Sequence, residues 1–147
     1  MGKEKIERVE DMPVYQLLHE LALKIEKVTR DYGPDFRWLR NQSLRSSESA
    51  CANMTEGFYA QYSTEYLQAL YRSRREARET MTHVNYARDV GALPATTANS
   101  LITRYEAAMH QLGNLIASIE RKIQSRGKSK PGFTTVKVAS GDYEVNH

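Results

Sequence analysis

The sequence predicts an all-α fold, an antiparallel up-down bundle of four helices. Four segments place apolar residues at alternating steps of three and four, which is the spacing of one helix face. Short connections containing Gly or Pro separate these segments, and brief connections join antiparallel neighbours in a bundle. The chain has 147 residues, of which 40% are hydrophobic and 27% charged, a balance typical of one globular domain.

The first helix is expected over residues 12–32. Pro13 suits a first-turn position, Asp11 is a candidate N-cap, and Gly33-Pro34 ends the segment. Its apolar face comprises Val14, Leu18, Leu21, Ile25, Val28 and Tyr32.

The second helix is expected over residues 35–58, and its middle is poor in large side chains. Such a helix has little intrinsic drive to form, so it needs close packing against its neighbours. We therefore expect Ala52→Leu to overpack the interface and cost roughly 1–3 kcal/mol. Gly57 suits the left-handed turn that follows a helix end. The small residues are Ser43, Ser46, Ser47, Ser49, Ala50, Cys51 and Ala52.

The third helix is expected over residues 63–90, with Ser63 as its N-cap and Gly91 as its end. The fourth follows Pro94 and has the most regular heptad pattern in the chain. Its apolar positions are Leu101, Tyr105, Ala108, Leu112, Leu115, Ile119 and Ile123.

Composition divides the chain into three parts. Residues 1–11 form a charged N-terminal lead, residues 12–126 the bundle, and residues 127–147 a flexible C-terminal tail that begins with a linker-like composition. Within the tail, residues 135–138 alternate like a short strand that has no evident partner strand. We expect the tail to be mobile or to become ordered on a partner.

Several protein classes are disfavoured by composition. No apolar run approaches the roughly 20 residues that cross a bilayer, and the charged start is unlike a signal peptide. A single cysteine, Cys51, cannot form an internal disulfide and suits a reducing cytoplasm. We therefore expect a cytoplasmic protein without membrane contact.

No pattern in the sequence indicates an enzyme. His19-Glu20 begins like a zinc-protease motif, but Leu23 stands where that motif needs its second His. Glu79/His83 and Glu106/His110 are four residues apart, whereas di-iron bundles use a spacing of three. Cys51 lies in a small-residue segment and is interpreted as a buried, inert thiol. We predict no catalytic residue, no metal and no cofactor.

Two groups of basic residues are candidates for binding a polyanion. The net charge is +3, and the positive excess comes from residues 61–147. Glu76 and Glu79 alternate with the first group and can offset it by local ion pairs, whereas no acidic residue interrupts residues 121–130. A solvated charged face is the alternative interpretation. The candidate residues are Arg72, Arg74, Arg75, Arg78, Arg121, Lys122, Arg126, Lys128 and Lys130.

Aromatic residues outside the apolar stripes predict self-association. A bundle of this size buries one face per helix, and aromatics left on the surface often mark a partner contact. The residues concerned are Tyr15, Tyr59, Tyr62, Tyr71 and Tyr86.

The order and spacing of several motifs resemble one known family. Val14-Tyr15-Gln16 and His19-Glu20-Leu21-Ala22 match its first helix, Glu65-Tyr66 and Ala87-Arg88-Asp89-Val90-Gly91 its third, and Leu112-Gly113-Asn114-Leu115-Ile116 its last. The second helix contributes a motif in which polar side chains pair with main-chain groups or a neighbouring helix. This motif contains Arg45, Asn53, Glu56 and Gly57.

These residues are similar to those of the four-helix-bundle proteins encoded in intervening sequences of large-subunit ribosomal RNA genes. They also resemble the accessory variability protein of diversity-generating retroelements, which works with a reverse transcriptase. The resemblance implies a ring-like homo-oligomer, a pentamer, that binds RNA, RNA–DNA or a reverse transcriptase complex without enzymatic activity. A protein–protein scaffold with no nucleic-acid role is the alternative. The sequence does not distinguish a retroelement cassette from a ribosomal RNA insert.

Overall fold

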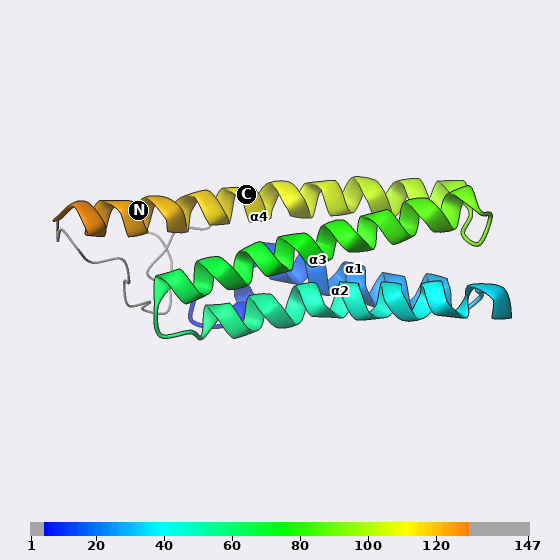
Figure 1. The fold of residues 1–147 in the computed structure, drawn as a ribbon, viewed down its shortest axis with the longest axis horizontal. Coiled ribbons are helices and arrows are strands. Elements are labelled where there is room, and N and C mark those ends of the chain that lie inside the picture. The colour runs from blue at the N-terminus through cyan, green and yellow to red at the C-terminus, as the bar shows by residue number, and fades with distance from the viewer. Residues whose placement is uncertain (1–4, 130–147) are drawn as a thin grey trace.

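The computed structural model describes residues 5–129, and within that range the chain is helical and has no strand. Short 3-10 turns at Val9–Asp11 and Pro34–Phe36 precede the first two helices. Figure 1 shows that successive helices run in opposite directions, which confirms the expected antiparallel up-down bundle. The α helices are α1 (Pro13–Thr29), α2 (Arg37–Phe58), α3 (Ser63–Asp89) and α4 (Ala95–Ser129).

A single hydrophobic core lies along the axis of the bundle, where the apolar stripes of the four helices meet. The stripes predicted from the 3-and-4 spacing are buried, apart from a few positions near the helix ends that are half-buried. Burying apolar side chains in this way is the main force that holds amphipathic helices together. Large side chains at its centre include Phe58, Tyr66, Leu70, Leu101, Tyr105 and Leu112.

The starts of two helices differ from the prediction, while one end agrees with it. Met12, not Asp11, is the N-cap of α1, and Pro13 takes the expected first position. Tyr62, not Ser63, precedes α3, and neither cap side chain makes a capping hydrogen bond. Both caps have the extended backbone that is usual for an N-cap, and Met12 and Ser63 are buried. Gly91 adopts a φ of 80° after α3, as expected for a left-handed helix end.

Gly57 has a different role from the one predicted. It lies inside α2, and among the described residues only Gly91 has a positive φ. A Cβ added at Gly57 would overlap the Cβ of Ala69 and lie 3.0 Å from Cδ1 of Tyr66. Glycine is therefore needed because α2 and α3 approach closely here, not because the chain turns.

Hydroxyl groups inside the bundle connect α2 to α3. The hydroxyls of Ser46 and Thr80 are buried and lie 2.6 Å apart, and Ser73 Oγ donates to the Ala50 carbonyl at 2.7 Å. Buried polar groups must be paired, so these contacts favour one register between the two helices. This arrangement explains how a helix with so many serines can be buried.

The small-residue segment of α2 is buried on one side only. Cys51 is 7% exposed, which confirms the predicted burial of its thiol, and this burial raises the pKa of the thiol to about 12. Ala52, the next residue, is exposed. The expectation that Ala52→Leu overpacks an interface is therefore wrong, because one helical step turns residue 52 away from the core.

The last helix is much longer than the first. It has 35 residues, or about 52 Å at 1.5 Å per residue, against 17 residues in α1. In Figure 1 its final turns, coloured orange, extend beyond the start of α3. The helix continues to Ser129, past the predicted start of the tail at residue 127. The rest of the predicted tail, residues 130–147, lies outside the described residues.

Candidate nucleic-acid interface

The arginines of α3 fall into two kinds. Arg75 and Arg78 are exposed, and neither forms an ion pair within residues 5–129. Arg72 and Arg74 are half-buried: Nε of Arg72 donates to Oδ1 of Asn53 at 3.0 Å, and the Arg74 guanidinium lies 5.5 Å from the centre of the Tyr71 ring. Arg75 and Arg78 are thus the α3 cations that a polyanion could reach most directly.

The two glutamates that alternate with the α3 arginines, Glu76 and Glu79, pair with the neighbouring helix and not with those arginines. Nη1 of Arg45, on α2, lies 3.2 Å from Oε2 of Glu76, and the same guanidinium forms an ion pair with Glu79. Nε2 of His83 lies 3.6 Å from Glu79 Oε2. The expectation that Glu76 and Glu79 offset their neighbours on α3 is wrong, because their side chains point across the α2–α3 contact.

The second basic group lies near the end of α4. Arg121 and Arg126 are exposed and Lys122 is half-buried. Lys128 belongs to the last turn of α4, and Lys130 lies outside the described residues. The Tyr71 hydroxyl donates to Oε2 of Glu120 at 2.7 Å, and this hydrogen bond raises the pKa of Tyr71.

That bond between α3 and α4 also indicates where the two basic groups lie. Arg72 and Arg74 follow Tyr71 on α3, and Arg121 follows Glu120 on α4. Both groups therefore begin at the same level along the bundle. Because α3 and α4 run in opposite directions, the exposed cations Arg75 and Arg78 extend from this level toward the end of α3, and Arg121 and Arg126 toward the end of α4.

The predicted α2 motif supports the structure rather than a reactive site. Nδ2 of Asn53 donates to the Ser49 carbonyl at 2.9 Å, while its oxygen accepts from Arg72, so it pairs with both main chain and neighbouring helix as expected. Arg45 bridges to α3, and Gly57 permits close approach. Glu56 is exposed.

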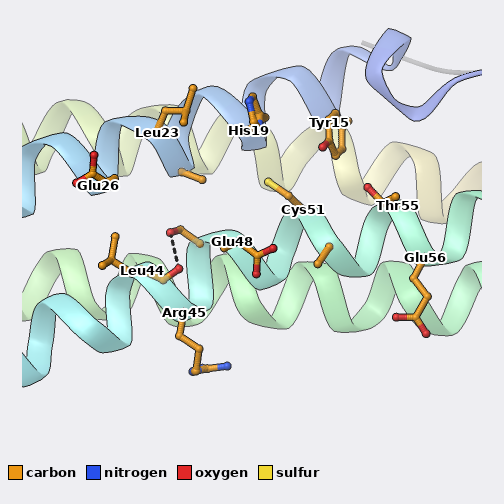
Figure 2. Close-up of a pocket in the computed structure, with 13 residues that line it drawn as sticks. Tyr15, His19, Leu23, Glu26, Leu44, Arg45, Glu48, Cys51, Thr55 and Glu56 are labelled. Carbon is orange, nitrogen blue, oxygen red and sulfur yellow. Dashed lines mark hydrogen bonds between the residues drawn. The ribbon is translucent and has the colours of Figure 1, made fainter.

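An apolar groove that the sequence analysis missed lies between α1 and α2. Figure 2 shows Tyr15, His19 and Leu23 on α1 and Cys51 and Thr55 on α2 along it, whereas Arg45 and Glu56 point away from α1. The groove has a volume of about 860 Å³, and the Leu23 side chain is 59% exposed beside it. Two sequence signals point to it: the consecutive apolar residues from position 21 to 23, since a helix buries one face, and Tyr15, an aromatic outside the apolar stripe of α1. Further lining residues are Ala22, Leu44, Ser47, Glu48, Cys51, Ala52 and Thr55.

The described residues offer neither a metal-binding cluster nor a membrane-spanning helix. No three His, Cys, Asp or Glu side chains between residues 5 and 129 are arranged to hold a metal ion. None of the helices in this range is long and apolar enough to span a membrane.

The fold and these surfaces define a class of protein, an antiparallel four-helix bundle with exposed cations on α3 and α4. The chain belongs to the 23S rRNA-intervening sequence protein family, whose sequence model matches residues 10–114. This match covers the first three helices and more than half of α4.

A solved structure has a similar fold. It is the crystal structure of a protein with unknown function from the S23 ribosomal protein family of Bacteroides thetaiotaomicron VPI-5482. The TM-score is 0.67 at 21% sequence identity, and the match covers 70% of this chain and 97% of the other. No curated protein sequence matches the chain.

Proposed function

We propose that this protein is a non-enzymatic, homo-oligomeric accessory protein that binds RNA, either free or as RNA–DNA. The observation that carries the proposal is the exposure of Arg75 and Arg78 without ion pairs, while Arg45 holds the nearby carboxylates. Exposed cations without compensating acids attract phosphates and release the counterions condensed on them. Arg121 and Arg126 extend the basic surface toward the end of α4.

The proposal is tested by measuring RNA binding at several salt concentrations. We expect binding with little sequence preference, because contacts from Lys and Arg to the backbone carry no base information. The logarithm of the association constant should fall linearly with the logarithm of salt, by roughly 0.7–0.9 per phosphate contact. Absence of RNA retention at low salt would favour the scaffold alternative, in which these cations only solvate the surface.

The α1–α2 groove supports self-association, and we propose that it contributes to a ring-like assembly, a pentamer by family resemblance. The groove presents apolar side chains beside a leucine that is 59% exposed, so a second copy covering it would remove this surface from water. Several copies in one ring would also repeat the basic surface and raise RNA affinity through avidity.

Replacing Leu23 by Glu is expected to lower the oligomer mass in light scattering at micromolar concentration. The carboxylate would lose hydration in the contact and face Glu26 and Glu48, which line the same groove. Lys24→Glu is the matched control, since Lys24 is exposed on α1 but does not line the groove. An unchanged mass for Leu23→Glu would exclude the groove as the subunit contact.

A reverse transcriptase complex is the proposed protein partner, by resemblance to the accessory variability protein of diversity-generating retroelements. Neighbouring genes distinguish a retroelement cassette from a ribosomal RNA insert. A reverse transcriptase gene with template and variable repeats would support the retroelement, and flanking ribosomal RNA would support the insert. The proposed location in both is the cytoplasm.

A further inference from the structure

Two exposed aromatic residues from different helices contact each other at one end of the bundle. Trp38, in the first turn of α2, is 51% exposed, and Tyr86, near the end of α3, is 46% exposed. Their ring centroids are 5.8 Å apart, with an angle of 62° between the ring planes. This edge-to-face arrangement fixes both rings while leaving aromatic surface open to a ligand.

The aromatic pair continues the exposed face of α3 that carries its unpaired cations. Arg75, Arg78, Thr82 and Tyr86 follow one another at steps of three, four and four, which keeps them on one side of the helix. Eight residues separate Arg78 from Tyr86, or about 12 Å along the axis. Arg37, next to Trp38, adds an exposed positive charge.

Two carboxylates near this face are paired, and a third, Asp35, is exposed next to Arg37 at the start of α2. Glu79 is held by Arg45, and Asp89 accepts a hydrogen bond from Nε of Arg88 at 3.1 Å. Toward the start of α3, Glu56 and Glu65 are exposed in the depression that Arg72 also lines. On the α3 face, the surface suited to an anion is therefore the stretch from Arg75 to the aromatic pair.

Cations and an aromatic face together match the chemistry of an unpaired nucleotide strand. Phosphates bind the guanidinium groups, and bases stack on aromatic rings with little sequence preference. In a duplex the bases are stacked on each other, so their faces are not available to a side chain. We propose that Trp38 and Tyr86 form a stacking site for a base of single-stranded RNA or DNA whose phosphates lie along Arg75 and Arg78. This inference rests on the proposed nucleic-acid function and specifies its ligand.

A second copy of the chain is the competing occupant of the aromatic pair. The apolar α1–α2 groove offers a better surface for another subunit, whereas Trp38 and Tyr86 lie beside uncompensated cations. Charge complementarity thus favours a polyanionic strand at this end of the bundle.

The first experiment uses the intrinsic fluorescence of Trp38, the only tryptophan in the chain. Wild-type protein is titrated with oligouridylate and, separately, with a blunt RNA duplex, while binding is followed by anisotropy of a labelled strand. We expect the single strand to quench Trp38 in parallel with binding and the duplex to leave it unchanged. Binding of oligouridylate without quenching would overturn the stacking site and leave the proposed function intact.

The second experiment separates stacking from charge. Trp38→Leu combined with Tyr86→Leu should weaken single-strand binding by about 5- to 150-fold, the range for losing one stacked base, without changing the salt slope. Arg75→Gln combined with Arg78→Gln should instead reduce the slope, by about 0.7 per lost phosphate contact with a single strand. Trp38→Phe combined with Tyr86→Phe is the control that keeps both aromatic faces and should retain most of the affinity.

The remaining outcomes are also distinct. A leucine double variant that binds oligouridylate like the wild type overturns the inference. If the leucine double variant has a lower oligomer mass in light scattering, the aromatic pair belongs to a subunit contact, and the inference is overturned as well. If the wild-type protein binds neither the single strand nor the duplex at low salt, both the stacking site and the proposed function are overturned.

Discussion

Gly57→Leu is expected to lower the free energy of unfolding by about 3 kcal/mol, the upper part of the usual range for overpacking. A side chain at this position would overlap Ala69 and press on the Tyr66 ring, so α2 and α3 would have to separate. Thermal and denaturant unfolding followed by circular dichroism measure the effect. Gly57→Ala should lie between leucine and wild type, because the overlap with Ala69 outweighs the gain in helix propensity of roughly 0.5–1 kcal/mol.

Gly113→Ala is the matched control for this prediction. Gly113 is also helical, in α4, but a Cβ added there meets no atom within 4 Å. Only the helix-propensity gain remains, so this variant should be more stable than wild type by about 0.5–1 kcal/mol. If Gly57→Leu unfolded at the wild-type midpoint, the close approach of α2 and α3 would be wrong.

Changing the five α4-end cations together to Gln is expected to weaken RNA binding strongly and flatten its salt dependence. Each lost phosphate contact removes roughly 0.7–0.9 from the slope of log K against log salt. The oligomer mass and helix content should not change, because Arg121, Lys122 and Arg126 lie outside the hydrophobic core. The variant replaces Arg121, Lys122, Arg126, Lys128 and Lys130.

The effect now expected for replacing the α3 arginines differs from the one that the sequence predicts. The alternation of Arg with Glu predicted a smaller effect for Arg72, Arg75 and Arg78. Since Glu76 pairs with Arg45, we expect Arg75 and Arg78 to contribute as much per residue as the α4-end cations. An RNA slope unaffected by both sets of substitutions would mean that neither basic group contacts phosphate.

The bundle could be predicted from the sequence because its signal is repeated many times. Each helix contributes several apolar residues in the same phase, so one misassigned position does not change the outcome. Gly91 was also predictable, because a left-handed helix end depends on local backbone geometry. The caps were less predictable, since packing of Met12 and Ser63 determined where the helices begin.

Features that depend on how two helices meet were not predictable from a single sequence. Gly57 was assigned to a turn because glycine serves turns and close contacts alike. Ala52 was assigned to the core because its neighbours are small, although the helical phase turns it outward. The partner of Glu76 depends on the register between α2 and α3, which brings Arg45 into reach.

The candidate interface was found only in part for the same reason. Cations are visible as residue types, so Arg75 and Arg78 could be named as candidates, and the structure places both on the surface. Trp38 and Tyr86 are 48 positions apart in the sequence, and only the folded chain brings the rings together. The α1–α2 groove likewise combines residues from two helices, and neither helix alone reveals it.

The buried serines of α2 have a consequence for the order in which the chain acquires its structure during synthesis. The hydroxyl of Ser46 meets Thr80, and the carbonyl of Ala50 accepts from Ser73, so α2 finds these polar partners on α3. The ribosome releases α1 and α2 first, when those partners do not yet exist. We expect the nascent N-terminal half to remain unfolded until α3 emerges, because a polar helix gains little from docking on α1 alone. A ribosome stalled before α3 would therefore expose a protease-sensitive chain.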